Sequence, residues 1–286
     1  MIIKNKNVIN AVDIIRTVIT SFLIFNIAML FPLTSFIFPI YKIRANKRFD
    51  KKEILIINVS LFILITLVSK LTLMFYVSLF LVIETFYYFF ERLRIKVKTF
   101  DRIIITTLIS TVLLMFFLRF AGDTLELLKT TINDIYINQY GVSKRDVNII
   151  FSYMEKYKVF LLYIYIGIIV YFTHFILDKD KYKNWKISYQ WIILYIVAFF
   201  INKYANFGKV LSLNIIAMVK MTYALYGVKL IYKLINSKVN NVIISQIGAL
   251  LLGFYFSGFA FIIGALECFD FIKIHVIKLN NNGGRK

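Results

Sequence analysis

Two charged side chains stand inside long apolar stretches of the chain. Glu84 lies in the stretch 77–86 and Lys220 in the stretch 213–221. Placing a charge inside a bilayer costs about 2.5–3.5 kcal/mol on insertion scales, so residues of this kind are candidates for function. A carboxylate and an ammonium can bind the polar groups of a ligand and neutralise each other when it is absent. We expect Glu84 and Lys220 to line a ligand cavity; the alternative is a structural ion pair or a snorkelling lysine.

Small and polar residues recur around Lys220 at helical spacing. The residues that share this helix face are Asn214, Ala217, Lys220, Ala224 and Gly227. In a membrane helix such a face meets protein or water in preference to lipid. Tyr223 is the aromatic residue that we add to the candidate site. The predicted ligand-binding residues are therefore Glu84, Asn214, Lys220, Tyr223 and Gly227.

The sequence carries none of the common motifs for catalysis or metal binding. It has no P-loop and no G-x-G-x-x-G, H-E-x-x-H or G-x-S-x-G pattern. One cysteine, Cys268, and two histidines, His174 and His275, are too few for a disulfide framework or a Cys/His metal cluster. We therefore expect a protein that is not an enzyme and that holds no metal and no cofactor.

The elements that carry these residues belong to a chain with the composition of a membrane protein. Hydrophobic residues make up 60% of its 286 residues and charged residues 17%, whereas soluble domains have roughly 45–50% and 25%. Several apolar runs approach the ~20 residues of a membrane-spanning helix, without the alternation of a β-barrel strand. The sequence predicts an all-α, polytopic helical membrane bundle of about 8–10 membrane segments, forming one integral membrane domain over 1–286. The apolar runs are 17–31, 33–41, 54–69, 71–90, 103–121, 159–177, 187–201, 210–235 and 242–272.

Three of these regions are expected to contain a turn. The run 54–90 would form a helix of roughly 55 Å, which is too long for a single crossing of a ~30 Å hydrocarbon core. The run 241–279 poses the same problem, and the first apolar region holds both prolines of the chain, which disfavour one straight helix. The residues predicted to mark the turns are Pro32 and Pro39, Lys70, and the group Gly253, Ser257 and Gly258.

Residues 122–156 form the one sizeable segment outside the apolar runs. Apolar residues recur at helical spacing from Leu125 to Ile135, and Gly141 suits the end of a helix. Ser143 with Asp146 resembles a capping box that opens a second helix. We expect an external connector of two short amphipathic helices, which either lie on the outer membrane surface or cover a pocket.

The net charge of +20 is explained by the membrane topology. If the N-terminus is cytoplasmic and each run crosses once, most Lys and Arg residues fall in loops on the cytoplasmic side, as the positive-inside rule requires. The largest of these loops are 42–52 and 92–102. We therefore expect a bacterial plasma-membrane protein with both termini in the cytoplasm and no nucleic-acid partner. No cleavage site follows the first apolar run, so that run is expected to remain as an anchor.

Several short motifs resemble those of a known family. They lie at 140–143, at 184–187, at Asn214 with 223–228, and at 263–273. Together they resemble the YybS-like family of bacterial multispanning membrane proteins, over nearly the whole chain in architecture. Where the family has a Tyr/Leu-Gln-Gly pattern, this chain has Leu225-Tyr226-Gly227, with Tyr in place of Gln. The family's ending of Asp and then Asp-Phe-Arg is approximated imperfectly by Glu267 and Asp270-Phe271-Ile272-Lys273. The family looks distantly related to the substrate-capture subunits of energy-coupling-factor vitamin transporters and to a rod-shape morphogenesis protein.

The resemblance implies a helical bundle with one of two roles. The first is a substrate-binding subunit that takes up a small molecule with an external ATPase as its partner. The second is a non-transporting scaffold in envelope or cell-division biology, which would bind other membrane proteins through its small-residue faces. The two roles predict different structures: the first requires an outward-opening cavity lined by Lys220, Tyr223 or Glu84, and the second a densely packed bundle there.

Overall fold

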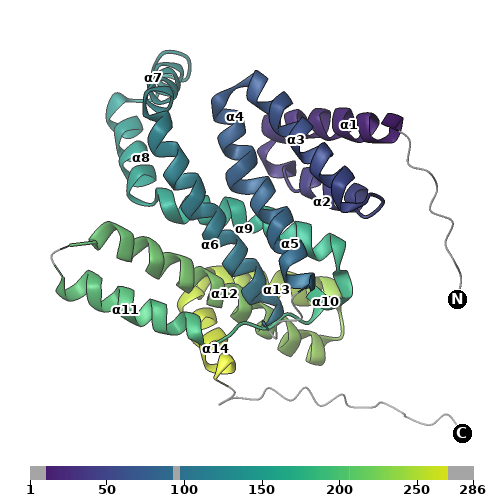
Figure 1. Cartoon of the computed structure of the whole chain (residues 1–286). Helices are drawn as coiled ribbons and strands as arrows, with labels where there is room; N and C mark the ends of the chain where they lie inside the picture. The colour runs from purple at the N-terminus through teal and green to yellow at the C-terminus, as the bar shows by residue number, and fades with distance from the viewer. Residues whose placement is uncertain (1–10, 93–96, 206, 270–286) are drawn as a thin grey trace, which may run out of the picture. The chain divides into compact units, whose positions relative to one another are not determined.

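The computed structural model describes residues 11–92, 97–205 and 207–269. Within these residues every regular element is a helix (Figure 1). Contacts divide the chain into two compact units, Met1–Asn184 and Trp185–Lys286. The prediction of one domain over 1–286 stays a prediction, and the two units are described separately.

The first unit contains the helices up to α10. Three short segments of other helical forms connect some of these helices. A 3-10 turn lies between α1 and α2 and another between α6 and α7, and a π-helical segment lies between α4 and α5. The elements are α1 (Ala11–Leu30), η1 (Pro32–Thr34), α2 (Ile37–Asn46), α3 (Lys51–Val68), α4 (Lys70–Phe75), the π-helix η2 (Tyr76–Leu81), α5 (Val82–Arg92), α6 (Thr99–Leu118), η3 (Arg119–Ala121), α7 (Gly122–Asn138), α8 (Lys144–Lys156), α9 (Lys158–Leu177) and α10 (Lys179–Lys183).

Five helical stretches of the described chain are long and apolar enough to cross a membrane, or six if one bent pair counts as a span. The chain is therefore an all-α, multi-pass membrane protein. The sequence predicts about 8–10 membrane segments because its count also includes helices that are shorter or less apolar than these five or six. For example, α3 carries Lys51, Lys52 and Glu53 in its first turn, and the apolar α11 (Gln190–Tyr204) has only 15 residues. The five stretches are Ala11–Leu30, Lys70–Glu91, Thr99–Asn138, Lys158–Leu177 and Lys209–Val239.

The predicted turns are found close to the expected residues. Helix α3 ends at Val68, and Ser69 caps α4 by accepting hydrogen bonds from the next backbone N–H groups. A 3-10 turn begins at Pro32 and separates α1 from α2. In the last apolar run the chain bends by 105° at Phe256, between α13 (Val242–Tyr255) and α14 (Ser257–Cys268). Each long run is thus divided, as its length requires.

Four aromatic rings hold α1, α2 and η2 together. Phe25 of α1 and Phe38 of α2 lie edge to face, with ring centroids 5.5 Å apart. Tyr76 and Phe80 of η2 contact both of them in the same manner. Edge-to-face aromatic pairs contribute about 0.5–1.5 kcal/mol each beyond the area that they bury. This cluster fixes α2 against the π-helical segment.

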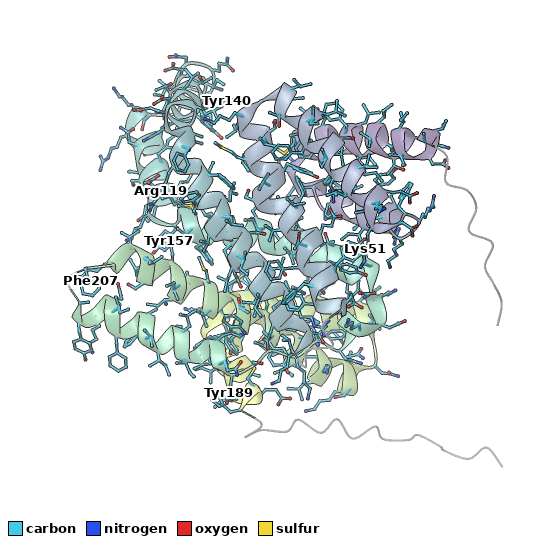
Figure 2. The ribbon with its side chains drawn as sticks, in the orientation of Figure 1. Lys51, Arg119, Tyr140, Tyr157, Tyr189 and Phe207 are labelled. Atoms are coloured by element: carbon cyan, nitrogen blue, oxygen red, sulfur yellow. The ribbon has the colours of Figure 1, made fainter. Side chains whose placement is uncertain are left out.

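The 122–156 connector consists of the two predicted helices, α7 and α8. Figure 2 labels Tyr140 at the turn between them. Gly141 has φ +64°, a left-handed conformation that suits the end of a helix and favours glycine. Ser143 Oγ accepts the Asp146 N–H at 3.1 Å, which confirms the predicted N-cap.

The second unit contains α11, α12 (Lys209–Val239), α13 and α14. Figure 2 labels Tyr189 and Phe207 at the two ends of α11. Glycines bring the backbones close together: a Cβ built on Gly227 of α12 would lie 1.8 Å from the Ala260 carbonyl oxygen of α14. A Cβ on Gly264 would lie 2.1 Å from the Tyr223 carbonyl oxygen. The small-residue faces of this unit are therefore occupied within the chain.

Candidate functional site

The π-helical segment determines which side chains meet in the first unit. Tyr76 and Glu84 would lie about 80° apart around an uninterrupted α-helix of 3.6 residues per turn. A π turn contains one residue more than an α-helical turn. Tyr76 and Glu84 are therefore oriented like two residues seven positions apart in an α-helix, whose directions around the axis differ by about 20°. Tyr76 and Glu84 consequently present their polar groups to the same neighbour. Such π turns are often found at functional sites.

That neighbour is Lys42 of α2. Its ammonium lies 2.6 Å from Glu84 Oε2 and donates a hydrogen bond of 2.7 Å to the Tyr76 hydroxyl. Asn46, one turn further along α2, donates its amide to Glu84 Oε1 at 2.6 Å. We call Lys42, Asn46, Tyr76 and Glu84 the buried polar centre.

The buried polar centre holds two charges away from solvent. The side chains of Lys42 and Glu84 are 1% and 5% exposed. Burial lowers the pKa of Lys42, but the adjacent Glu84 carboxylate and Tyr76 hydroxyl outweigh burial and raise that pKa above its usual value. Lys42 therefore keeps its proton at neutral pH, and the two charges compensate each other. Removing one partner of such a pair leaves an uncompensated buried charge.

Helix α2 has a second polar face, which borders a cavity of about 1040 Å³. Helix α2 gives Tyr41 and Arg44 to this cavity and the turn after it gives Arg48, whereas Lys42 and Asn46 lie on the face toward the buried polar centre. Helix α2 is therefore the wall between the two. The other walls come from α1 and the start of α3. The charged residues that line the cavity are Asp13, Arg16, Arg44, Arg48, Asp50 and Glu53.

The residues predicted to form the site are divided between the two units. Glu84 belongs to the first unit, and the other four lie on α12 of the second. The predicted pairing of Glu84 with Lys220 is corrected: Glu84 pairs with Lys42. Lys220 is exposed on α12, where a lysine can extend along the helix toward polar groups at the membrane surface.

The polar face of α12 is a packing surface. Asn214 donates its amide to the Val210 carbonyl of its own helix at 2.7 Å. Tyr223 is buried and donates its hydroxyl to the Ser188 carbonyl at 2.5 Å. Gly227 lies against the backbone of Ala260. Tyr223 and Gly227 hold α12 to its neighbours, and none of the three residues lines the cavity of the first unit.

A second group of polar residues in the first unit joins α5, α6, α9 and α10. Glu91 forms ion pairs with Lys181 and, at 3.6 Å, with Arg102. The buried His174 ring lies with Nδ1 3.0 Å from the Tyr182 hydroxyl. The two groups share a buried hydrogen bond, and burial raises the pKa of the Tyr182 hydroxyl. This group ties α10 to the bundle.

The functional residues that sequence reasoning missed are on α2. Lys42 was counted as part of the basic loop 42–52, because it directly follows an apolar run. The spacing of Lys42 and Asn46, four residues apart, would have shown that they share a helix face. Nothing in the sequence marks the π turn that aligns Tyr76 with Glu84.

The comparisons with known proteins give no relative for this arrangement. The chain matches no protein-family model, no curated protein and no solved structure. The candidate site is therefore interpreted from its own geometry.

Proposed function

We propose that this protein is a ligand-binding subunit of the bacterial plasma membrane, which binds a small polar molecule in the cavity between α1, α2 and α3. The observation that carries the proposal is the cavity itself, about 1040 Å³ with six charged residues in its lining. Ligand cavities commonly have volumes of about 300–1,000 Å³ and a few polar groups that orient the ligand. Charged groups gathered around a space of this size suit a ligand with charges of its own.

The predicted topology places this cavity at the cytoplasmic face. It lies at the N-terminal end of α1 and next to the basic loop 42–52. The positive-inside rule assigns such a loop to the cytoplasm. The resemblance to the YybS-like family is compatible with this role and with the scaffold role, so the proposal relies on the cavity and its charged lining.

Glu84 and Tyr223 are buried and do not line the cavity. This is the dense packing that the scaffold role predicts at those residues. The ligand-binding role therefore relies on the separate cavity between α1, α2 and α3.

The scaffold role has less support from its expected docking surfaces. It relied on the small-residue faces of the last apolar run as docking surfaces for other membrane proteins. Ala249, Gly253 and Ala260 are buried within the second unit, where Gly253 and Gly264 contact α12. These faces stabilise the chain itself.

Native mass spectrometry of the full chain, released from detergent micelles, tests the proposed function. We expect a small molecule retained from the cells at substoichiometric or full occupancy, and an ATPase that co-purifies under mild extraction. A protein that carries only other membrane proteins, with no retained small molecule, would favour the scaffold role.

A further inference from the structure

Three arginines line the cavity of the first unit. Arg16 lies on α1, Arg44 on α2, and Arg48 in the turn that follows α2. The guanidinium group is a planar fork of five N–H donors that binds phosphate oxygens in pairs. Lys47 lies between Arg44 and Arg48 in the sequence but does not line the cavity. The cavity is thus lined by arginines from α1, α2 and the turn after α2, while the neighbouring lysine is left outside.

The positive charges of these arginines are not used elsewhere in the described chain. None of the three forms an ion pair with a carboxylate in residues 11–92, 97–205 and 207–269. Two of the cavity's three carboxylates already serve a capping box. Glu53 accepts the Asp50 N–H at 2.7 Å, and the Asp50 side chain accepts a backbone N–H in return. The arginines are therefore available to an anion, and the carboxylates of the capping box can still accept hydrogen bonds from its hydroxyl or ammonium groups.

The face of α1 that borders the cavity changes from polar to apolar along the helix. Asp13, Arg16, Thr17 and Thr20 recur at helical spacing and all line the cavity. The same spacing continues with Ile24 and Ile27, which are apolar. A ligand held by the polar end of this face would have apolar surface beside it. That arrangement suits a charged headgroup with a hydrophobic part, although a small phosphate ester would use the polar end alone.

We infer that the cavity recognises a phosphate ester, with Arg16, Arg44 and Arg48 binding the phosphate and Asp50 and Glu53 facing its hydroxyl or ammonium end. This inference rests on the proposed function and names the ligand class of that site. The same chemistry is offered by an anionic phospholipid headgroup and by a soluble phosphate ester. Basic pockets at the cytoplasmic ends of membrane helices are known to bind lipid headgroups.

The test measures binding of two probes to the full chain in detergent and in nanodiscs. Glycerol 3-phosphate represents the soluble ester, and dioleoylphosphatidylglycerol represents the lipid; dioleoylglycerol, which lacks phosphate, is the reference. The variants are R44Q/R48Q, R44K/R48K and the matched control K47Q. Size-exclusion elution and the unfolding temperature establish that each variant is folded; should the double variant fail to fold, R16Q and R48Q replace it.

We expect the wild type and K47Q to bind at least one phosphate probe, and R44Q/R48Q to bind it more than tenfold more weakly. The lysine variant should recover part of the affinity, because it restores the charge without the paired donors. Binding of phosphatidylglycerol alone identifies a lipid headgroup, and binding of glycerol 3-phosphate identifies a soluble ester. Equal binding to the wild type and R44Q/R48Q, or no binding of either phosphate probe, overturns the inference.

The failure of this inference differs from the failure of the proposed function. A molecule without phosphate that is retained by the wild type and by R44Q/R48Q alike leaves the ligand-binding role in place and rejects the phosphate class. A wild-type chain that retains no molecule and binds neither probe rejects both.

Discussion

The Lys42 ammonium lies 2.6 Å from the Glu84 carboxylate, and both side chains are almost completely removed from solvent. The two residues come from different helices, α2 and α5, and the Tyr76 hydroxyl of η2 accepts a further hydrogen bond from Lys42. An ion pair in a membrane bundle is expensive to form and more expensive to break. It fixes the position of α2, which is also the wall of the cavity. The buried polar centre and the cavity are therefore parts of one arrangement.

Breaking the buried pair should destabilise the first unit strongly. Lys42→Met leaves the Glu84 carboxylate buried without its cation, and we expect a loss of about 3–5 kcal/mol. Glu84→Gln should lower the stability by a similar amount, because it leaves the Lys42 ammonium buried without its anion. The measurement is thermal or denaturant unfolding of the purified chain in detergent, followed by intrinsic fluorescence.

The exposed pair Glu155–Lys158, between α8 and the start of α9, provides the matched control. Both side chains are largely exposed, at 72% and 46%, and they lie three residues apart. Glu155→Gln should change stability by less than about 1 kcal/mol, because water screens the pair. Lys42→Met combined with Glu84→Leu should recover much of the loss, since neither charge then remains buried. Equal effects at the two sites would contradict the role of burial.

The contact of α12 with α14 depends on a glycine, Gly227. In Gly227→Ala the new Cβ would fall 1.8 Å from the Ala260 carbonyl oxygen, so the helices must separate. We expect a loss of at least about 2 kcal/mol, as for other overpacked interiors. Gly258→Ala is the control, because nothing lies within 4 Å of its Cβ. Resistance to limited proteolysis, compared at matched detergent concentration, reports the difference.

The opposite ranking would contradict the packing of the second unit. An alanine within a helix has a better intrinsic propensity than glycine by about 1 kcal/mol, so Gly258→Ala should be neutral or slightly stabilising. If Gly227→Ala behaves in the same way, α12 and α14 do not approach each other as described.

Lys229 connects α12 with the segment that precedes α11. Its ammonium lies 4.3 Å from the centre of the Trp185 ring and donates a hydrogen bond of 2.5 Å to the Trp185 carbonyl. Lys229→Met removes both interactions, for a loss of about 1–3 kcal/mol. In a Trp191→Phe background Trp185 is the one remaining tryptophan of the chain, so its fluorescence follows unfolding of this region.

The exposed Lys233, one turn away on the same helix, is the control for this prediction. Lys233→Met removes a charge of the same kind without a ring beneath it. We expect its unfolding midpoint to match that of the Trp191→Phe background. A midpoint lowered equally by both substitutions would show that general charge, and not the contact with Trp185, is responsible.

Much of the fold follows from simple patterns in the sequence. The lengths of the apolar runs require helices that turn near Lys70 and between Gly253 and Ser257, and the structure has both turns. Ser143 is an N-cap because its hydroxyl accepts a backbone N–H of the following helix turn. This interaction depends only on neighbouring residues, so it can be predicted from the local sequence. Local rules therefore predict the elements of this chain well.

The candidate site depends on long-range pairing, which the sequence does not show. Glu84 was recognised as unusual because it interrupts an apolar run, and it is indeed buried. Its partner was predicted wrongly, since Lys220 interrupts another run in the same way whereas Lys42 stands at the edge of a basic loop. Only the folded position of α2 and the π turn at Tyr76 decide between the two lysines.

Ligand occupancy after filling the cavity tests the central proposal most directly. Ala45 lines the cavity from α2, and Lys47, which directly follows that helix, does not. Native mass spectrometry of the wild type, Ala45→Trp and Lys47→Trp, purified in parallel, compares the retained small molecule. We predict that the wild type and Lys47→Trp keep it and that Ala45→Trp loses it while its unfolding temperature stays unchanged. Equal retention in Ala45→Trp, or its loss in Lys220→Gln alone, would place the ligand away from α2 and contradict the account.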